Sequence, residues 1–123
     1  MKKILIVDDE PDITEVLSLI LSDEGYEIKT LNTAANIQSE IDNFNPAVLL
    51  LDVKIWDLDG RLVAKEIRDQ ERNKPLKICL VTGSFPNEEI KGLTIKSFDA
   101  YIMKPFNLTD VVEVVYQLIN DSD

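Results

Sequence analysis

The pattern of apolar residues is the feature that most limits how this chain can fold. Five short runs rich in β-branched residues recur along its 123 residues, separated by stretches with helical spacing. The expected strands are Lys3–Val7, Tyr26–Leu31, Ala47–Leu51, Lys77–Val81 and Ala100–Met103. Such alternation requires parallel strands joined by right-handed crossovers. The sequence therefore predicts an α/β fold, a doubly wound five-stranded parallel sheet flanked by five helices.

The stretches between these strands contain residues that favour helix ends. Pro11 suits a first helical turn and Gly25 the left-handed residue after a helix, while Pro46 stops the second helix and Asn107 is a good N-cap for the last. The fourth helix, after Pro86, has the weakest pattern. The apolar positions are Ile13, Val16, Leu17, Ile20 and Leu21, then Ile37, Ile41 and Phe44, then Leu62, Val63 and Ile67, then Ile90 and Leu93, then Leu108, Val111, Val112, Val115 and Ile119.

Composition narrows the class of protein. No apolar stretch approaches the ~20 residues that cross a bilayer, so no membrane segment is expected. Acids outnumber bases 23 to 13, and a net charge of −10 disfavours direct binding of nucleic acid. The chain has no histidine, which excludes any mechanism that needs a histidine side chain of its own. Its one cysteine, Cys79, lies in an apolar run and is expected as a buried thiol, which fits the reducing cytoplasm.

Polar residues follow four of the expected strands, namely Asp8 and Asp9, Asp52, Thr82, and Lys104. Each alone could be a loop or cap residue, but ligands of this fold bind beyond the carboxyl ends of the strands. Carboxylates that converge there repel one another unless a cation binds, and oxygen ligands without His or Cys favour Mg²⁺. Lys104 and Thr82 can stabilise an oxyanion-rich group while one aspartate attacks phosphorus.

Together these motifs resemble the receiver domain of two-component response regulators, the CheY-like fold. The motifs are Asp8-Asp9, Leu50-Leu-Asp52, Asp57-Leu-Asp-Gly60, Thr82 and Tyr101-Ile-Met-Lys-Pro-Phe106. The resemblance covers essentially the whole chain, so residues 1–123 are expected to form a single receiver domain with the flavodoxin-like strand order 2-1-3-4-5. It implies a phosphorelay protein that takes a phosphoryl group from a phosphohistidine of a sensor kinase or phosphotransfer protein. Such a domain catalyses its own phosphotransfer and dephosphorylation but is not otherwise an enzyme.

The resemblance also implies a role for each site residue. Asp52 is the phosphoacceptor. Mg²⁺ is held by Asp9 and Asp52 directly, by Asp8 through water, and by the backbone carbonyl of Lys54. Lys104 pairs with the phosphoryl oxygens.

A switch between two conformations is implied as well. Thr82 bonds to a phosphoryl oxygen and shifts on phosphorylation, and Tyr101 turns inward as Thr82 moves. The peptide bond between Lys104 and Pro105 is expected to be cis.

Several residues depart from the family pattern. Trp56 stands where most receivers have proline, and Ser97 and Phe98 replace a usual glycine and alanine. Lys54 and Ser84 occupy positions that tune the lifetime of the aspartyl phosphate. Trp56 and Phe98 are the only support for the main alternative, a degenerate receiver that binds a partner without being phosphorylated, and the complete set of Asp, Thr and Lys residues argues against it.

Other readings of the same residues fit less well. A flavodoxin would need a phosphate cradle where this chain has acids after the first strand. A haloacid-dehalogenase-type phosphatase would need a second aspartate where Lys54 stands. An EF-hand loop would begin at Ile55, which cannot bind Ca²⁺.

The last helix is the candidate surface for contact with an output partner. Viewed down its axis, the last helix carries apolar residues over a wide arc that runs from Val114 round to Tyr116. This arc is either an exposed docking patch or, as we favour, a surface buried against the first helix. Residues Leu108–Asn120 include no Lys or Arg, unlike DNA-binding regulators that dimerise through this face. The output partner or output domain is not identified, and both a stand-alone regulator and a piece of a larger one are compatible with the sequence.

Overall fold

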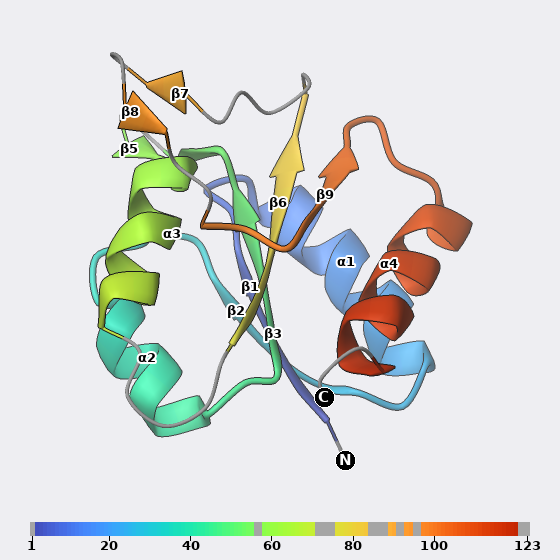
Figure 1. Ribbon diagram of the computed structural model, residues 1–123. Helices are drawn as coiled ribbons and strands as arrows, with labels where there is room; N and C mark the ends of the chain where they lie inside the picture. The colour runs from blue at the N-terminus through green and yellow to red at the C-terminus, as the bar shows by residue number, and fades with distance from the viewer. Residues whose placement is uncertain are drawn as a thin grey trace.

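A five-stranded parallel sheet forms the centre of the molecule (Figure 1). The computed structural model describes residues 2–55, 58–70, 76–83, 89–90, 93–94 and 97–120. In spatial order the strands are β2 (Glu27–Leu31), β1 (Lys3–Val7), β3 (Val48–Asp52), β6 (Lys77–Thr82) and β9 (Ala100–Met103). This is the order 2-1-3-4-5 of the five expected strands, so the doubly wound α/β fold is confirmed.

The central strands are buried on both faces, which explains their nearly continuous apolar sequences. In β1, Ile4 and Ile6 pack on one side of the sheet, while Leu5 and Val7 pack on the other. β3 and β6 alternate in the same way, and β6 brings the fully buried Cys79 into the first of these two cores. The polar alternation of β2 correctly predicted an edge strand.

Two helices cover each face of the sheet (Figure 1). α1 (Pro11–Asp23) and α4 (Leu108–Asn120) lie on one face, and α2 (Ile37–Phe44) and α3 (Gly60–Asp69) lie on the other. The expected end signals are present. Gly25 has φ +93° after α1, and the Asn107 side chain accepts a hydrogen bond of 2.8 Å from the Asp110 N–H at the start of α4.

The structure differs from the sequence prediction around Ile90 and Leu93. A helix was expected there, but the described residues form the antiparallel pair β7 (Glu89–Ile90) and β8 (Leu93–Thr94), so the described part of the chain has four helices and not five. The segment offers little for a helix, because Gly92 and the β-branched residues Ile90 and Thr94 all have low helix propensity. A second short pair, β4 (Lys54–Ile55) with β5 (Leu58–Asp59), was not anticipated.

The apolar arc of α4 is only partly covered. α1 packs beside α4, and Val114 and Ile119 rest against the core that the two helices share. Leu108 and Tyr116 remain exposed. Within the part of the chain that the structure describes, no helix combines the length and the apolar character needed to cross a membrane.

Candidate functional site

The carboxyl ends of the central strands bring together the polar residues that the sequence singled out. Asp8 follows β1, while Asp52 and Thr82 end β3 and β6. Their side chains lie in the protein rather than in solvent, since the three residues are 1%, 6% and 4% exposed respectively. Because β1 and β6 both pair with β3, the three residues sit side by side at one edge of the sheet.

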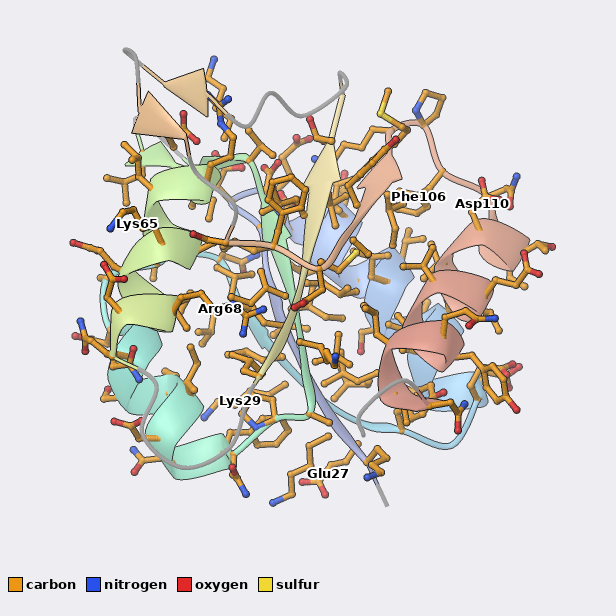
Figure 2. The ribbon with its side chains drawn as sticks, viewed as in Figure 1. Glu27, Lys29, Lys65, Arg68, Phe106 and Asp110 are labelled. Carbon is orange, nitrogen blue, oxygen red and sulfur yellow. The ribbon has the colours of Figure 1, made fainter. Side chains whose placement is uncertain are left out.

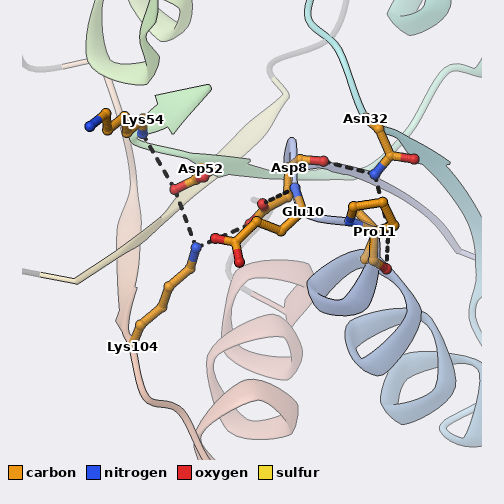
Figure 3. Close-up of polar contacts among 8 residues, drawn as sticks. Asp8, Glu10, Pro11, Asn32, Asp52, Lys54 and Lys104 are labelled. Carbon is orange, nitrogen blue, oxygen red and sulfur yellow. Dashed lines mark hydrogen bonds and ion pairs between the residues drawn. The ribbon is translucent and has the colours of Figure 1, made fainter. Parts of the chain in front are cut away.

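Lys104 connects two of these acids (Figure 3). Its ammonium nitrogen lies 3.2 Å from Oδ2 of Asp8 and 3.5 Å from Oδ1 of Asp52. The backbone N–H of Lys104 also donates to the Thr82 carbonyl at 2.7 Å, which extends the pairing of β9 with β6 beyond the strands themselves. A positive charge thus occupies the space between the two buried carboxylates.

The environment of Asp52 makes its negative charge costly. Burial and repulsion from Asp8 raise the pKa of the Asp52 carboxyl to about 6 from an ordinary value of 3.8. Lys104 and the backbone N–H of Lys54, which donates to Oδ1 of Asp52 at 3.3 Å, only partly offset this rise. Burial lowers the pKa of Lys104, but the two carboxylates outweigh it and the net shift is upward. Lys104 therefore stays charged, and the site as a whole favours a further cation.

The loop after β1 adds more carboxylate oxygens. Asp8, Asp9 and Glu10 each offer an oxygen, and these atoms all lie within 4.8 Å of one another. The Glu10 N–H donates to Oδ1 of Asp8 at 2.9 Å, which holds the start of this loop. Oxygen donors in a partly buried acidic site suit Mg²⁺, so the residues fit the ion that the sequence predicted.

Thr82 and Tyr101, the expected switch residues, lie on the same face of the sheet. β6 and β9 pair with Leu80 opposite Tyr101 and Thr82 opposite Met103, so Thr82 and Tyr101 are diagonal neighbours. Tyr101 is half-buried against the core on the α2 and α3 side. The peptide bond between Lys104 and Pro105 is cis, as predicted.

The residues that depart from the family pattern are only partly described. Trp56 and Ser84 lie outside the described residues, as does Asp57. Ser97 is buried, and Phe98 packs against the core on the α2 and α3 side. The backbone of Lys54 contacts Asp52 while its side chain is exposed.

The contacts of two residues near the site were not predicted from the sequence. Gly60 opens α3 so close to β3 that a Cβ there would lie 2.2 Å from the Asp52 carbonyl oxygen. Asn32 follows β2 and donates through its side-chain amide to the Asp8 carbonyl at 2.9 Å. The available signal was position, because Asn32 follows a strand at the same edge of the sheet as the acids.

Comparison with known proteins identifies the family. The family model for the response regulator receiver domain matches residues 4–116. The chain belongs to this family. Its structure is similar to a CheY-like response regulator receiver domain from Methanospirillum hungatei JF-1, with 30% identity and a TM-score of 0.84 over 99% of this chain and 96% of that one. Receiver domains of this kind are signalling domains of two-component systems rather than ordinary enzymes.

Two other known proteins are similar to this chain. It is 35% identical to the response regulator TrrA of Thermotoga maritima, solved in complex with Mg²⁺–BeF, with a TM-score of 0.81 over 96% of this chain and 99% of that one. It is 30% identical over 99% of its length to the alkaline phosphatase synthesis transcriptional regulatory protein PhoP of Bacillus subtilis, of which it covers 50%. The chain spans about half the length or less of the first curated relatives that it matches.

Proposed function

We propose that this receiver accepts a phosphoryl group on Asp52 and changes conformation to control a partner. The observation that carries the proposal is the position of Lys104, whose ammonium lies between the buried carboxylates of Asp8 and Asp52. A cation held at that point can stabilise the oxygens of an incoming phosphoryl group as charge develops on them. Membership of the receiver family supports a phosphohistidine of a sensor kinase or phosphotransfer protein as the donor, and the absence of histidine from this chain agrees with a donor on another protein.

The proposed transfer step uses the charges that surround Asp52. An oxygen of the Asp52 carboxylate attacks phosphorus, the O–P bond forms as the N–P bond breaks, and the donor imidazole keeps the electron pair. Lys104 pairs with the phosphoryl oxygens, and the Thr82 hydroxyl donates to one of them. Asp8, Asp9, Asp52 and the Lys54 carbonyl would hold Mg²⁺, which supplies further positive charge to the phosphoryl oxygens when bound. Water later hydrolyses the acyl phosphate, which resets the domain.

The switch would run through the face that Thr82 shares with Tyr101. A shift of Thr82 toward the phosphoryl group vacates space beside Tyr101, and the half-buried ring turns inward to fill it.

We infer that residues 1–123 act as one receiver domain in the cytoplasm. Because relatives such as PhoP are transcriptional regulatory proteins, we infer a transcriptional output domain or partner, while the net charge of −10 disfavours direct DNA binding by this domain itself.

Intact mass spectrometry tests the proposal. With acetyl phosphate and Mg²⁺ we expect the wild type to gain one phosphoryl group and Asp52→Asn to gain none. Asp23→Asn, which changes an exposed acid at the end of α1, is the matched control and should be labelled like the wild type. Labelling of Asp52→Asn at the wild-type level would refute the assignment. A wild type that is never labelled would leave the non-phosphorylated, partner-binding receiver as the better description.

A further inference from the structure

Asn32 reaches from an exposed position to two buried partners beside the site (Figure 3). Its side-chain amide donates to the backbone carbonyl of Asp8 at 2.9 Å and to the Thr14 hydroxyl at 3.2 Å. Asp8 and Thr14 are only 1% and 4% exposed. The Thr14 hydroxyl in turn donates to the carbonyl of Pro11 at 3.0 Å. The Asn32 side chain thus ties the end of β2 both to Asp8, where the acidic loop begins, and to the first turn of α1, which follows that loop.

The Asn32 side-chain amide replaces a backbone hydrogen bond between β1 and β2. Up to Leu31 the strands β1 and β2 pair regularly, and the Asp8 N–H still donates to the Leu31 carbonyl at 3.1 Å. If the parallel pairing continued, the Asp8 carbonyl would accept a hydrogen bond from the backbone N–H two residues after Leu31. The chain leaves the strand at this point, and the Asn32 side chain makes that bond instead.

Each of the four polar atoms of Asp8 has a partner, and the partners come from the end of β2, the loop after β1 and the residue after β9. Its N–H is bound to Leu31 and its carbonyl to Asn32. Its Oδ1 accepts from the Glu10 N–H, and its Oδ2 faces the Lys104 ammonium. Of these four contacts, the one from Asn32 can be removed without changing a charge or a backbone group. Without it a nearly buried carbonyl loses its donor, and the loop is free to relax.

We propose that Asn32 is a positioning residue, which holds the Asp8–Glu10 loop in the geometry that binds Mg²⁺. This inference rests on the proposed function, because the ion it concerns is the one that phosphotransfer to Asp52 would use. Loss of a hydrogen bond that orients metal ligands typically weakens metal binding roughly 10–100-fold. Thr14 belongs to the same device, since its hydroxyl accepts from Asn32 and donates to Pro11.

The test compares Asn32→Leu, which keeps the size of the side chain but cannot donate, with the wild type. We expect its Mg²⁺ dissociation constant, measured by titration calorimetry, to rise roughly tenfold or more. We also expect solvent exchange of the Glu10 amide, measured by NMR without metal, to become faster while amides of the central strands are unchanged. Asn43→Leu, an exposed asparagine on α2, is the matched control and should alter neither quantity.

A purely structural role gives a different result. It predicts a general loss of stability, with faster exchange throughout the sheet and no change in Mg²⁺ affinity, and that result would overturn the inference. Unchanged exchange at Glu10 would overturn it too. Thr14→Val should weaken Mg²⁺ binding in the same direction, and the double variant should lose less than the sum of the two single losses because they share one network. The proposed function fails by another outcome, a wild type that binds Mg²⁺ but takes no phosphoryl group.

Discussion

In the metal-free protein, the Asp52 carboxyl lowers the free energy of unfolding by an amount that depends on pH. Its pKa rises to about 6 in the folded state from 3.8, so the folded state binds this proton more tightly than the unfolded chain does. The free energy of unfolding therefore falls as pH rises through this range. A shift of this size corresponds to about 3 kcal/mol. Without metal, we expect Asp52→Asn to be about 2–3 kcal/mol more stable than the wild type near neutral pH and about as stable at low pH.

Urea denaturation at several pH values measures this difference. Asp23→Asn serves again as the control, because that acid lies at the exposed end of α1 and should show no comparable dependence on pH. If Asp52→Asn were less stable than the wild type at neutral pH, attraction to Lys104 would outweigh burial and the repulsion from Asp8.

Gly60 sets how closely α3 can approach the acceptor strand. A Cβ at this residue would lie 2.2 Å from the Asp52 carbonyl oxygen and 2.9 Å from the Val53 Cα, and neither backbone atom can turn aside. Gly60→Ala must therefore push the helix away from β3. We expect this variant to lose roughly 1–3 kcal/mol of stability, measured by denaturation. Gly83→Ala is the matched control, because a Cβ there meets nothing within 4 Å. Equal stability of the two variants would mean that α3 shifts at no cost.

At the scale of elements, Arg68 joins α3 to the segments that lead into β6 and β9. Its guanidinium bonds to the carbonyls of Leu76 and Ser97 and to the carboxylate of Asp99, which also accepts from the Ile78 N–H at 2.8 Å. Figure 2 shows Arg68 pointing from α3 toward the sheet while Lys65 points away from it. This cluster fixes the starts of β6 and β9, whose other ends carry Thr82 and Lys104.

Removing the Arg68 guanidinium should therefore loosen three elements together. We expect Arg68→Met to lose about 2–4 kcal/mol of stability, because it leaves two carbonyls and a carboxylate without this donor. Arg68→Lys should restore little, since one ammonium cannot reproduce the planar fork. Lys65→Met, which breaks an exposed pair with Asp69 on the same helix, should change stability by about 0.5 kcal/mol or less. A loss of similar size in both Met variants would show that Arg68 acts only as a surface charge.

The sequence predicted the elements that local pattern determines. The strands were placed within a residue or two because buried parallel strands have distinctive apolar runs. Asp8, Asp52, Thr82 and Lys104, which the structure brings to the same end of the sheet, were singled out because each directly follows one of these runs. The prediction of a helix around Ile90 was wrong, because two apolar residues at helical spacing cannot outweigh neighbours with low helix propensity. Arg68 could not be foreseen, since its partners Ser97 and Asp99 lie 29 and 31 residues away and share no local pattern with it. The roles of Asn32 and Gly60 depend likewise on close approaches that only the folded sheet creates.

At the scale of the whole molecule, the site exists only when the sheet is complete. Lys104 meets Asp8 across 96 residues and Asp52 across 52, so three separate strands must be in place before these charges converge. An unfolded chain cannot bring the same carboxylates together. Any ion that binds among them therefore binds the folded state selectively and shifts the folding equilibrium by mass action.

Magnesium should consequently stabilise this receiver against unfolding. At a hundredfold excess over its dissociation constant we expect a gain of about 2.7 kcal/mol, provided that the unfolded chain does not bind the ion. The gain appears as a rise in melting temperature that grows with Mg²⁺ concentration and is lost in Asp9→Ala, which removes one of the clustered carboxylates. Glu15→Gln, a change to an exposed acid on α1, should keep the full rise and so separates site binding from general screening of a net charge of −10. An equal rise in Asp9→Ala would place the ion elsewhere on the molecule.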